Sequence, residues 1–130
     1  MSLYAYLDRL ENTLYSRQDM TVEKLHIDVR AIRTSFHALI GFHDNSHLTI
    51  FERLESTNQR DFKRVSYRFH YQNADGVLIF RYDNSPHYPH LATFPAHKHL
   101  PDQVIAAEAP DLADVLREID TLLYPRTDTV

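Results

Sequence analysis

The feature that most constrains the fold is an Asp-Gly pair between two runs of alternating aromatic and β-branched residues. The runs cover residues 65–71 and 77–83, and Asp75 and Gly76 lie between them. This pattern is the strongest short-range signal for a β-hairpin, because Asp-Gly accepts the positive φ angles of a tight turn. The sequence therefore predicts two antiparallel strands joined at Asp75-Gly76.

A two-residue turn at this position also predicts the register of the hairpin. Residues whose numbers add up to 151 then face each other, so that His70 opposes Arg81 and Arg68 opposes Asp83. A three-residue loop would shift the pairing and mix polar with aromatic side chains on each face, which favours the first register. The aromatic side chains then share the other face: Phe69, Tyr71, Phe80 and Tyr82.

The remaining periodicities predict an α+β domain. A leucine stripe at helical spacing indicates an amphipathic helix from Ser2 to about Ser16, and Asp111 can cap a second helix that Pro125 ends. Alternation with a period of two predicts further strands within residues 22–30, 32–40 and 48–51. We expect one domain over residues 1–130, an antiparallel sheet of four to five strands with the N-terminal and C-terminal helices packed on one face.

Composition excludes several classes of chemistry. The chain has no cysteine, which excludes disulfides, thiol catalysis and Cys-ligated metals, and its two glycines are too few for a phosphate-binding glycine loop. The net charge is −4, yet residues 53–98 carry seven basic and four acidic side chains. No apolar run is long enough for a membrane span and the N-terminus lacks a signal-peptide pattern, so we expect a cytoplasmic protein.

Histidine is in excess, and its distribution is uneven. Four of the nine histidines fall within residues 87–99, in a segment where Pro86, Pro89, Pro95 and Pro101 forbid a continuous helix or central strand. We therefore predict a loop that lies across an edge or the open face of the sheet. If it folds back over the polar face of the hairpin, its histidines meet Arg68, His70, Arg81 and Asp83 in one cleft.

Three runs in order resemble the TumE-like toxin family of prokaryotic toxin–antitoxin systems. They are residues 67–76, 80–87 and 93–99, and the helix after Asp111 fits the usual ending of the family. The resemblance implies a small cytoplasmic toxin encoded beside a DNA-binding antitoxin that neutralises it by direct contact. It supplies no catalytic residues, so the chemistry has to be inferred from the side chains.

The side chains suit metal-independent RNA cleavage, with no cofactor. One imidazole would take the proton of a ribose 2′-hydroxyl, a second would protonate the leaving 5′-oxygen, and two cations would stabilise the phosphorane. The predicted catalytic residues are His70, Arg81, His97, Lys98 and His99. The predicted substrate-binding residues are Arg68, Tyr82, Asp83, His87 and Tyr88. Among the aromatic side chains, Tyr82, Tyr88 and Phe94 could stack an unpaired base.

Two other interpretations stay open at this point. The spacings of His87 with His90 and of His97 with His99 are plausible for metal ligands, and Asp83 could complete such a site. The protein would then be a non-enzymatic module that holds a metal or a protein partner, or a co-repressor subunit. The cross-strand pairs of the hairpin can also be ordinary surface contacts. The sequence does not determine the oligomeric state, and a homodimer is possible.

Overall fold

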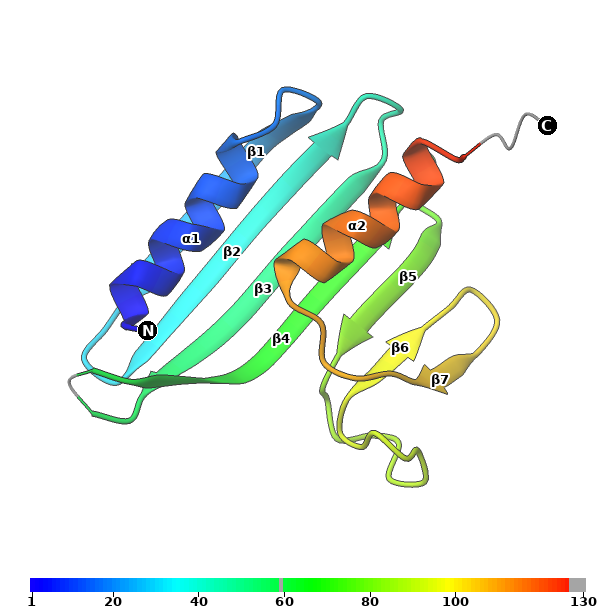
Figure 1. The fold of residues 1–130 in the computed structure, drawn as a ribbon. Helices are drawn as coiled ribbons and strands as arrows, with labels where there is room; N and C mark the ends of the chain where they lie inside the picture. Colours follow the sequence, from blue (N-terminus) through cyan, green and yellow to red (C-terminus); the bar gives the residue numbers. More distant parts are fainter. Residues whose placement is uncertain (59, 127–130) are drawn as a thin grey trace.

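The computed structural model describes residues 1–58 and 60–126. Both of the helices in this part of the chain lie on the same face of a single antiparallel sheet (Figure 1). The elements are α1 (Leu3–Tyr15), β1 (Met20–Val29), β2 (Arg33–Phe42), β3 (His47–Ser56), β4 (Phe62–Gln72), β5 (Leu78–Asp83), β6 (His97–His99), β7 (Val104–Ala106) and α2 (Leu112–Leu123). The predicted α+β class and the placement of the helices are confirmed.

The sheet is a meander in which every strand pairs with its neighbours in the chain, in the order β1-β2-β3-β4-β5-β6-β7. Its described strands number seven, so the prediction of four to five was too low. The two strands that were missed, β6 and β7, have three residues each. β6 fits between Pro95 and Pro101, where the prolines rule out a long strand and leave only a short one.

The core lies between the helices and the covered face of the sheet. Alternate residues of β2 to β5 point into it, and the largest of these side chains are fully buried: Phe36, Ile40, Leu48, Ile50, Phe69, Tyr71 and Phe80. The leucine stripes of the helices meet them through Leu7, Leu10 and Leu14 of α1 and through Leu112 and Leu116 of α2. Burial of about 2 kcal/mol per large apolar side chain makes this face the main source of stability.

Local capping fixes where both helices begin. The Ser2 hydroxyl accepts a hydrogen bond from the Ala5 amide at 3.1 Å, which satisfies one of the free amides at the start of α1. At α2 the Asp111 carboxylate accepts from the Asp114 amide at 2.8 Å, and the Asp114 carboxylate accepts from the Asp111 amide at 3.1 Å. This reciprocal capping box confirms the predicted start of the second helix.

The turn between β4 and β5 differs from the predicted two-residue turn. The Gly76 amide donates to the Asn73 carbonyl at 3.0 Å, and the Asn73 amide donates to the Val77 carbonyl at 2.9 Å. Residues 74–76 therefore form a three-residue loop, in which Gly76 has a φ of 81° that other residues adopt only with strain.

A β-bulge nevertheless restores the predicted register. The pairing with β5 shifts by one residue between Tyr71 and Gln72, which leaves Ile79 without an opposite residue. Beyond the bulge the predicted pairs are confirmed: Arg68 with Asp83, Phe69 with Tyr82, His70 with Arg81 and Tyr71 with Phe80. The bulge keeps the aromatic residues on the covered face despite the longer loop.

Candidate active site

The open face of the sheet gathers polar side chains from β4, β5 and β6. The β4–β5 register places His70 beside Arg81, and the β5–β6 register places His97 beside Asp83 and His99 beside Arg81. Because successive residues of a strand point to opposite faces, all five lie on the side away from the helices. Pairing of the short strand β6 is what brings its two histidines to the hairpin.

Three of these side chains converge on one point. His97 Nε2 lies 2.9 Å from Asp83 Oδ1 and 3.1 Å from His99 Nε2, and His99 Nε2 lies 3.3 Å from Asp83 Oδ2. Arg81 borders the group, with its Nε 3.2 Å from Asp83 Oδ2 and a terminal nitrogen 3.4 Å from His99 Nε2. We call Asp83, His97 and His99 the acceptor triad.

The hydrogen bonds of the acceptor triad indicate where its protons lie. His97 Nδ1 is 2.8 Å from the Pro95 carbonyl oxygen, which can only accept, so Nδ1 carries a hydrogen. The Arg81 guanidinium can only donate, so His99 Nε2 accepts from it. A neutral His97 would then bring three unprotonated atoms together, and a shared proton or a cation has to bridge them.

Burial and charge alter the acidity of the open-face histidines. Burial lowers the pKa of His99, and the nearby Arg81 guanidinium lowers it further, while Asp83 acts in the opposite direction. The pKa of His70 is also lowered, first by burial, with smaller contributions from Arg81 and Arg68. Both shifts favour the neutral imidazole.

The segment between β5 and β6 covers the acceptor triad, in agreement with the predicted loop across an edge or the open face of the sheet. The Tyr88 ring packs at 4.9 Å from the His97 ring and at 5.8 Å from the His99 ring, measured between centroids. The exposed fraction of His97 is only 1%. His87 and His90 are exposed, and neither joins the triad, although His90 lies edge-on to Tyr88.

Lys98 and Tyr82 do not belong to this cluster. Both point to the covered face, where the Glu118 carboxylate of α2 accepts hydrogen bonds from Lys98 Nζ and from the Tyr82 hydroxyl, each at 2.6 Å. Burial alone would lower the pKa of Lys98, but its hydrogen bonds to Glu118 and Tyr82 raise it. The expectation that these two side chains share a cleft with His97 and His99 is therefore wrong, because strand alternation places them on the other side of the sheet.

The open face also carries an aromatic side chain that the sequence did not single out. Phe51 of β3 is half-buried, and the guanidinium carbons of Arg53 and Arg68 lie 6.0 and 5.9 Å from its ring centre. His37 of β2 lies edge-on to the same ring at 6.5 Å. The sequence did carry a signal for Phe51, because its alternation with Ile50 and Glu52 places it on the opposite face of β3. The sequence did not show that this face of the sheet has no helix over it.

A pocket extends from Phe51 to Asp83, the one member of the acceptor triad that lines it. Its volume is about 320 Å³, and its lining includes Phe51, Arg68, Asp83, Ser85 and Pro86. This volume lies at the lower end of the range for small-molecule sites, and suits a single nucleobase. Predicted binding residues Arg68 and Asp83 thus border one pocket, whereas Tyr88 lies over the histidines.

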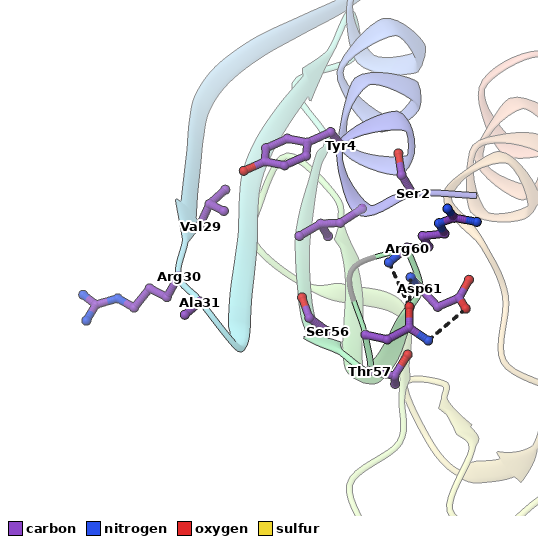
Figure 2. A pocket seen from close by; sticks show the side chains of 11 residues that line it. Ser2, Tyr4, Val29, Arg30, Ala31, Ser56, Thr57, Arg60 and Asp61 are labelled. Carbon is purple, nitrogen blue, oxygen red and sulfur yellow. Dashed lines mark hydrogen bonds between the residues drawn. The ribbon is translucent and has the colours of Figure 1, made fainter.

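A larger hollow than this pocket lies elsewhere, at the start of α1 (Figure 2). It has a volume of about 670 Å³ and is formed by residues of α1, of the β1–β2 turn and of the β3–β4 turn, among them Tyr4, Arg30 and Asp61. None of the predicted site residues lines it. We assign it no role in the candidate site.

A second buried polar group lies on the covered face. The Glu52 carboxylate is fully buried, accepts a short hydrogen bond from the Tyr6 hydroxyl and pairs with Arg64 at 3.2 Å. Burial raises the pKa of Glu52, with Tyr6 and Arg64 partly opposing the shift. The candidate residues taken from the sequence did not include Glu52. A signal was present, because Glu52 is the only carboxylate in the row of β3 that Leu48, Ile50 and Leu54 otherwise form.

Comparison with protein families identifies a toxin. A family model described as toxin TumE matches residues 4–123, which is nearly the whole chain, and the chain therefore belongs to the TumE toxin family. The resemblance inferred from residues 67–99 is confirmed and extends over both helices. Searches of curated proteins and of solved structures found no match. Within the described residues, neither helix is long and apolar enough to cross a membrane.

Proposed function

We propose that this chain is the toxin of a type II toxin–antitoxin pair and that it cleaves RNA on the open face of its sheet. Family membership supports the toxin class and, in general terms, an antitoxin partner. The observation that carries the ribonuclease proposal is the convergence of two imidazoles, a carboxylate and a guanidinium beside a pocket of nucleobase size.

In the proposed reaction the ribose 2′-oxygen attacks the adjacent phosphorus, and the bond from phosphorus to the 5′-oxygen breaks. His99, whose Nε2 accepts from Arg81 and so carries no hydrogen, takes the proton of the 2′-hydroxyl. His97, hydrogen-bonded at both ring nitrogens, gives a proton to the leaving oxygen. The products are a 2′,3′-cyclic phosphate and a free 5′-hydroxyl, and no metal takes part.

Other residues of the open face would hold the RNA. Arg81, whose side chain is one-third exposed, would stabilise negative charge on the phosphorane, and His70 lies next to it in the adjacent strand. Phe51 between two arginines offers a ring on which an unpaired base can stack. Tyr88 covers His97, so access of a phosphate requires the Tyr88 segment to move away from the histidines.

A ribonuclease assay with the purified full chain tests the proposal. In the presence of a chelator the protein should cleave single-stranded RNA and leave 2′,3′-cyclic phosphate ends, and His99→Ala should lower the rate by about a hundredfold or more. His26→Ala, which changes an exposed histidine of β1, is the matched control and should leave the rate unchanged. Intact RNA at high protein concentration would contradict the proposal.

The near-complete burial of His97 favours a second candidate, a non-catalytic module that acts only by binding. Such a protein could hold a partner or serve as a co-repressor subunit beside a DNA-binding antitoxin. Induced expression without the antitoxin separates the two. A ribonuclease toxin should stop growth and degrade cellular RNA, and the His99→Ala variant should do neither, whereas a binding module should leave RNA intact.

A further inference from the structure

The acceptor triad has the geometry of a metal site. Among the described residues, only Asp83, His97 and His99 bring three side-chain ligand atoms within 4.8 Å of one another. The two Nε2 atoms lie 3.1 Å apart, and each lies close to one of the two Asp83 carboxylate oxygens, His97 at 2.9 Å from Oδ1 and His99 at 3.3 Å from Oδ2. In a tetrahedral zinc site with bonds of about 2.05 Å, ligand atoms are about 3.3 Å apart, so little movement is needed to seat an ion.

The surroundings of the triad also fit a metal. The Pro95 carbonyl accepts a hydrogen bond from His97 Nδ1 and so turns the Nε2 lone pair toward the other two ligands. Metal-binding histidines usually have such an outer partner, which fixes the ring and its tautomer. The triad is small and nearly buried, which suits an ion better than a large ligand.

The net charge of the acceptor triad also favours a bound cation, provided that the Arg81 guanidinium turns away from it. Two neutral imidazoles and one carboxylate carry a net charge of −1, and three protein ligands leave a fourth position for water. Arg81 occupies the border of the triad, but its side chain is 34% exposed and can turn toward solvent when a cation arrives.

We propose that Asp83, His97 and His99 bind one first-row divalent metal ion, such as Zn²⁺, and that the bound ion blocks the acid–base chemistry of the two histidines. The blocking step rests on the proposed ribonuclease function, because the ion occupies the ring nitrogens that would transfer protons. Metal binding itself does not depend on that function. The ligand set differs from the one suggested by spacing alone, since His87 and His90 lie outside it.

Calorimetric titration of the chelator-treated, tag-free full chain with ZnCl₂ tests the site. We expect one Zn²⁺ per chain and tetrahedral absorption bands when Co²⁺ is used as the probe. His99→Gln should weaken binding by at least about tenfold while circular dichroism shows an unchanged fold. The double variant His87→Ala/His90→Ala is the matched control and should bind as the native chain does. Absence of stoichiometric binding, or binding lost only in the double variant, would overturn the site.

The same samples distinguish failure of the metal site from failure of the proposed function. Ribonuclease activity in chelator that falls at least tenfold when stoichiometric Zn²⁺ is added supports both inferences. Stoichiometric Zn²⁺ binding without any activity supports the site and overturns the ribonuclease. Activity only in the presence of the metal overturns the blocking role, because the ion would then be required.

Discussion

Asp83 of β5 and His97 of β6 face each other across the sheet with 2.9 Å between Oδ1 and Nε2, and both side chains are almost completely buried. A buried carboxylate is costly unless it is hydrogen-bonded, and His97 supplies the shortest of its contacts with a basic side chain. The pair therefore couples the candidate site to the stability of the β5–β6 pairing.

Replacing His97 should destabilise the fold. We expect His97→Ala to lower the free energy of unfolding by about 3 kcal/mol, because it leaves a cavity and removes the closest side-chain partner of a buried carboxylate. Urea unfolding followed by circular dichroism measures the loss. His26→Ala, on an exposed position of β1, should change stability by less than about 0.5 kcal/mol. Equal stabilities of the two variants would contradict the structural role of His97.

Tyr88 should control access to the acceptor triad. Tyr88→Ala removes the ring that packs on His97 and His99, so acylation of these two histidines by diethyl pyrocarbonate should become faster. The stability cost should be about 1 kcal/mol, typical of lost aromatic contacts. Mass spectrometry of the modified peptides gives the rates. Phe94→Ala, on an exposed position of the same segment, is the control, and equal rates in both variants would show that Tyr88 is not the cover.

Phe51 should contribute to RNA binding on the open face. If a base stacks on its ring, Phe51→Ala should weaken binding of a short single-stranded RNA by about 1–3 kcal/mol. Fluorescence anisotropy with the inactive His99→Ala background avoids cleavage during the measurement. Val77→Ala changes an exposed apolar residue outside the strands, and it should leave the affinity unchanged. A Phe51→Ala variant with native affinity would remove this ring from the binding surface.

Glu52 should make stability depend on pH. Its raised pKa means that the folded chain holds the proton more tightly than the unfolded chain does. This contribution is complete below the ordinary glutamate pKa of about 4.3 and is lost as the pH rises through the raised value. Glu52→Gln stays uncharged, so its stability relative to the native chain should increase with pH across that range.

Urea unfolding at several pH values between acid and neutral measures this trend. Glu55→Gln is the matched control, since it changes a partly exposed carboxylate of the same strand in a surface pair with Arg33. The control should differ from the native chain by a small and constant amount. A flat difference for Glu52→Gln as well would show that Glu52 is not held toward its protonated form.

Local sequence signals predicted the hairpin register, both helices and the Asp111 cap of the second helix. The predicted pairing of His70 with Arg81 is confirmed, but the predicted two-residue turn is wrong. The turn has three residues, and the bulge at Ile79 compensates for the additional residue. β6 could not be predicted, since three residues between two prolines have almost no strand signal of their own. Their strand conformation comes from pairing with β5 and β7.

The sequence by itself determined which residues alternate and which face of each element is apolar, because these depend on neighbours along the chain. It also supplied the histidine-rich segment and the family resemblance. The tertiary structure decided which of those residues meet. Pairing of β5 with β6 joined Asp83 to His97 and His99, and the same pairing turned Lys98 to Glu118 on the covered face. Contacts between strands far from each other in sequence depend on register, and a shift of one residue would have reversed both outcomes.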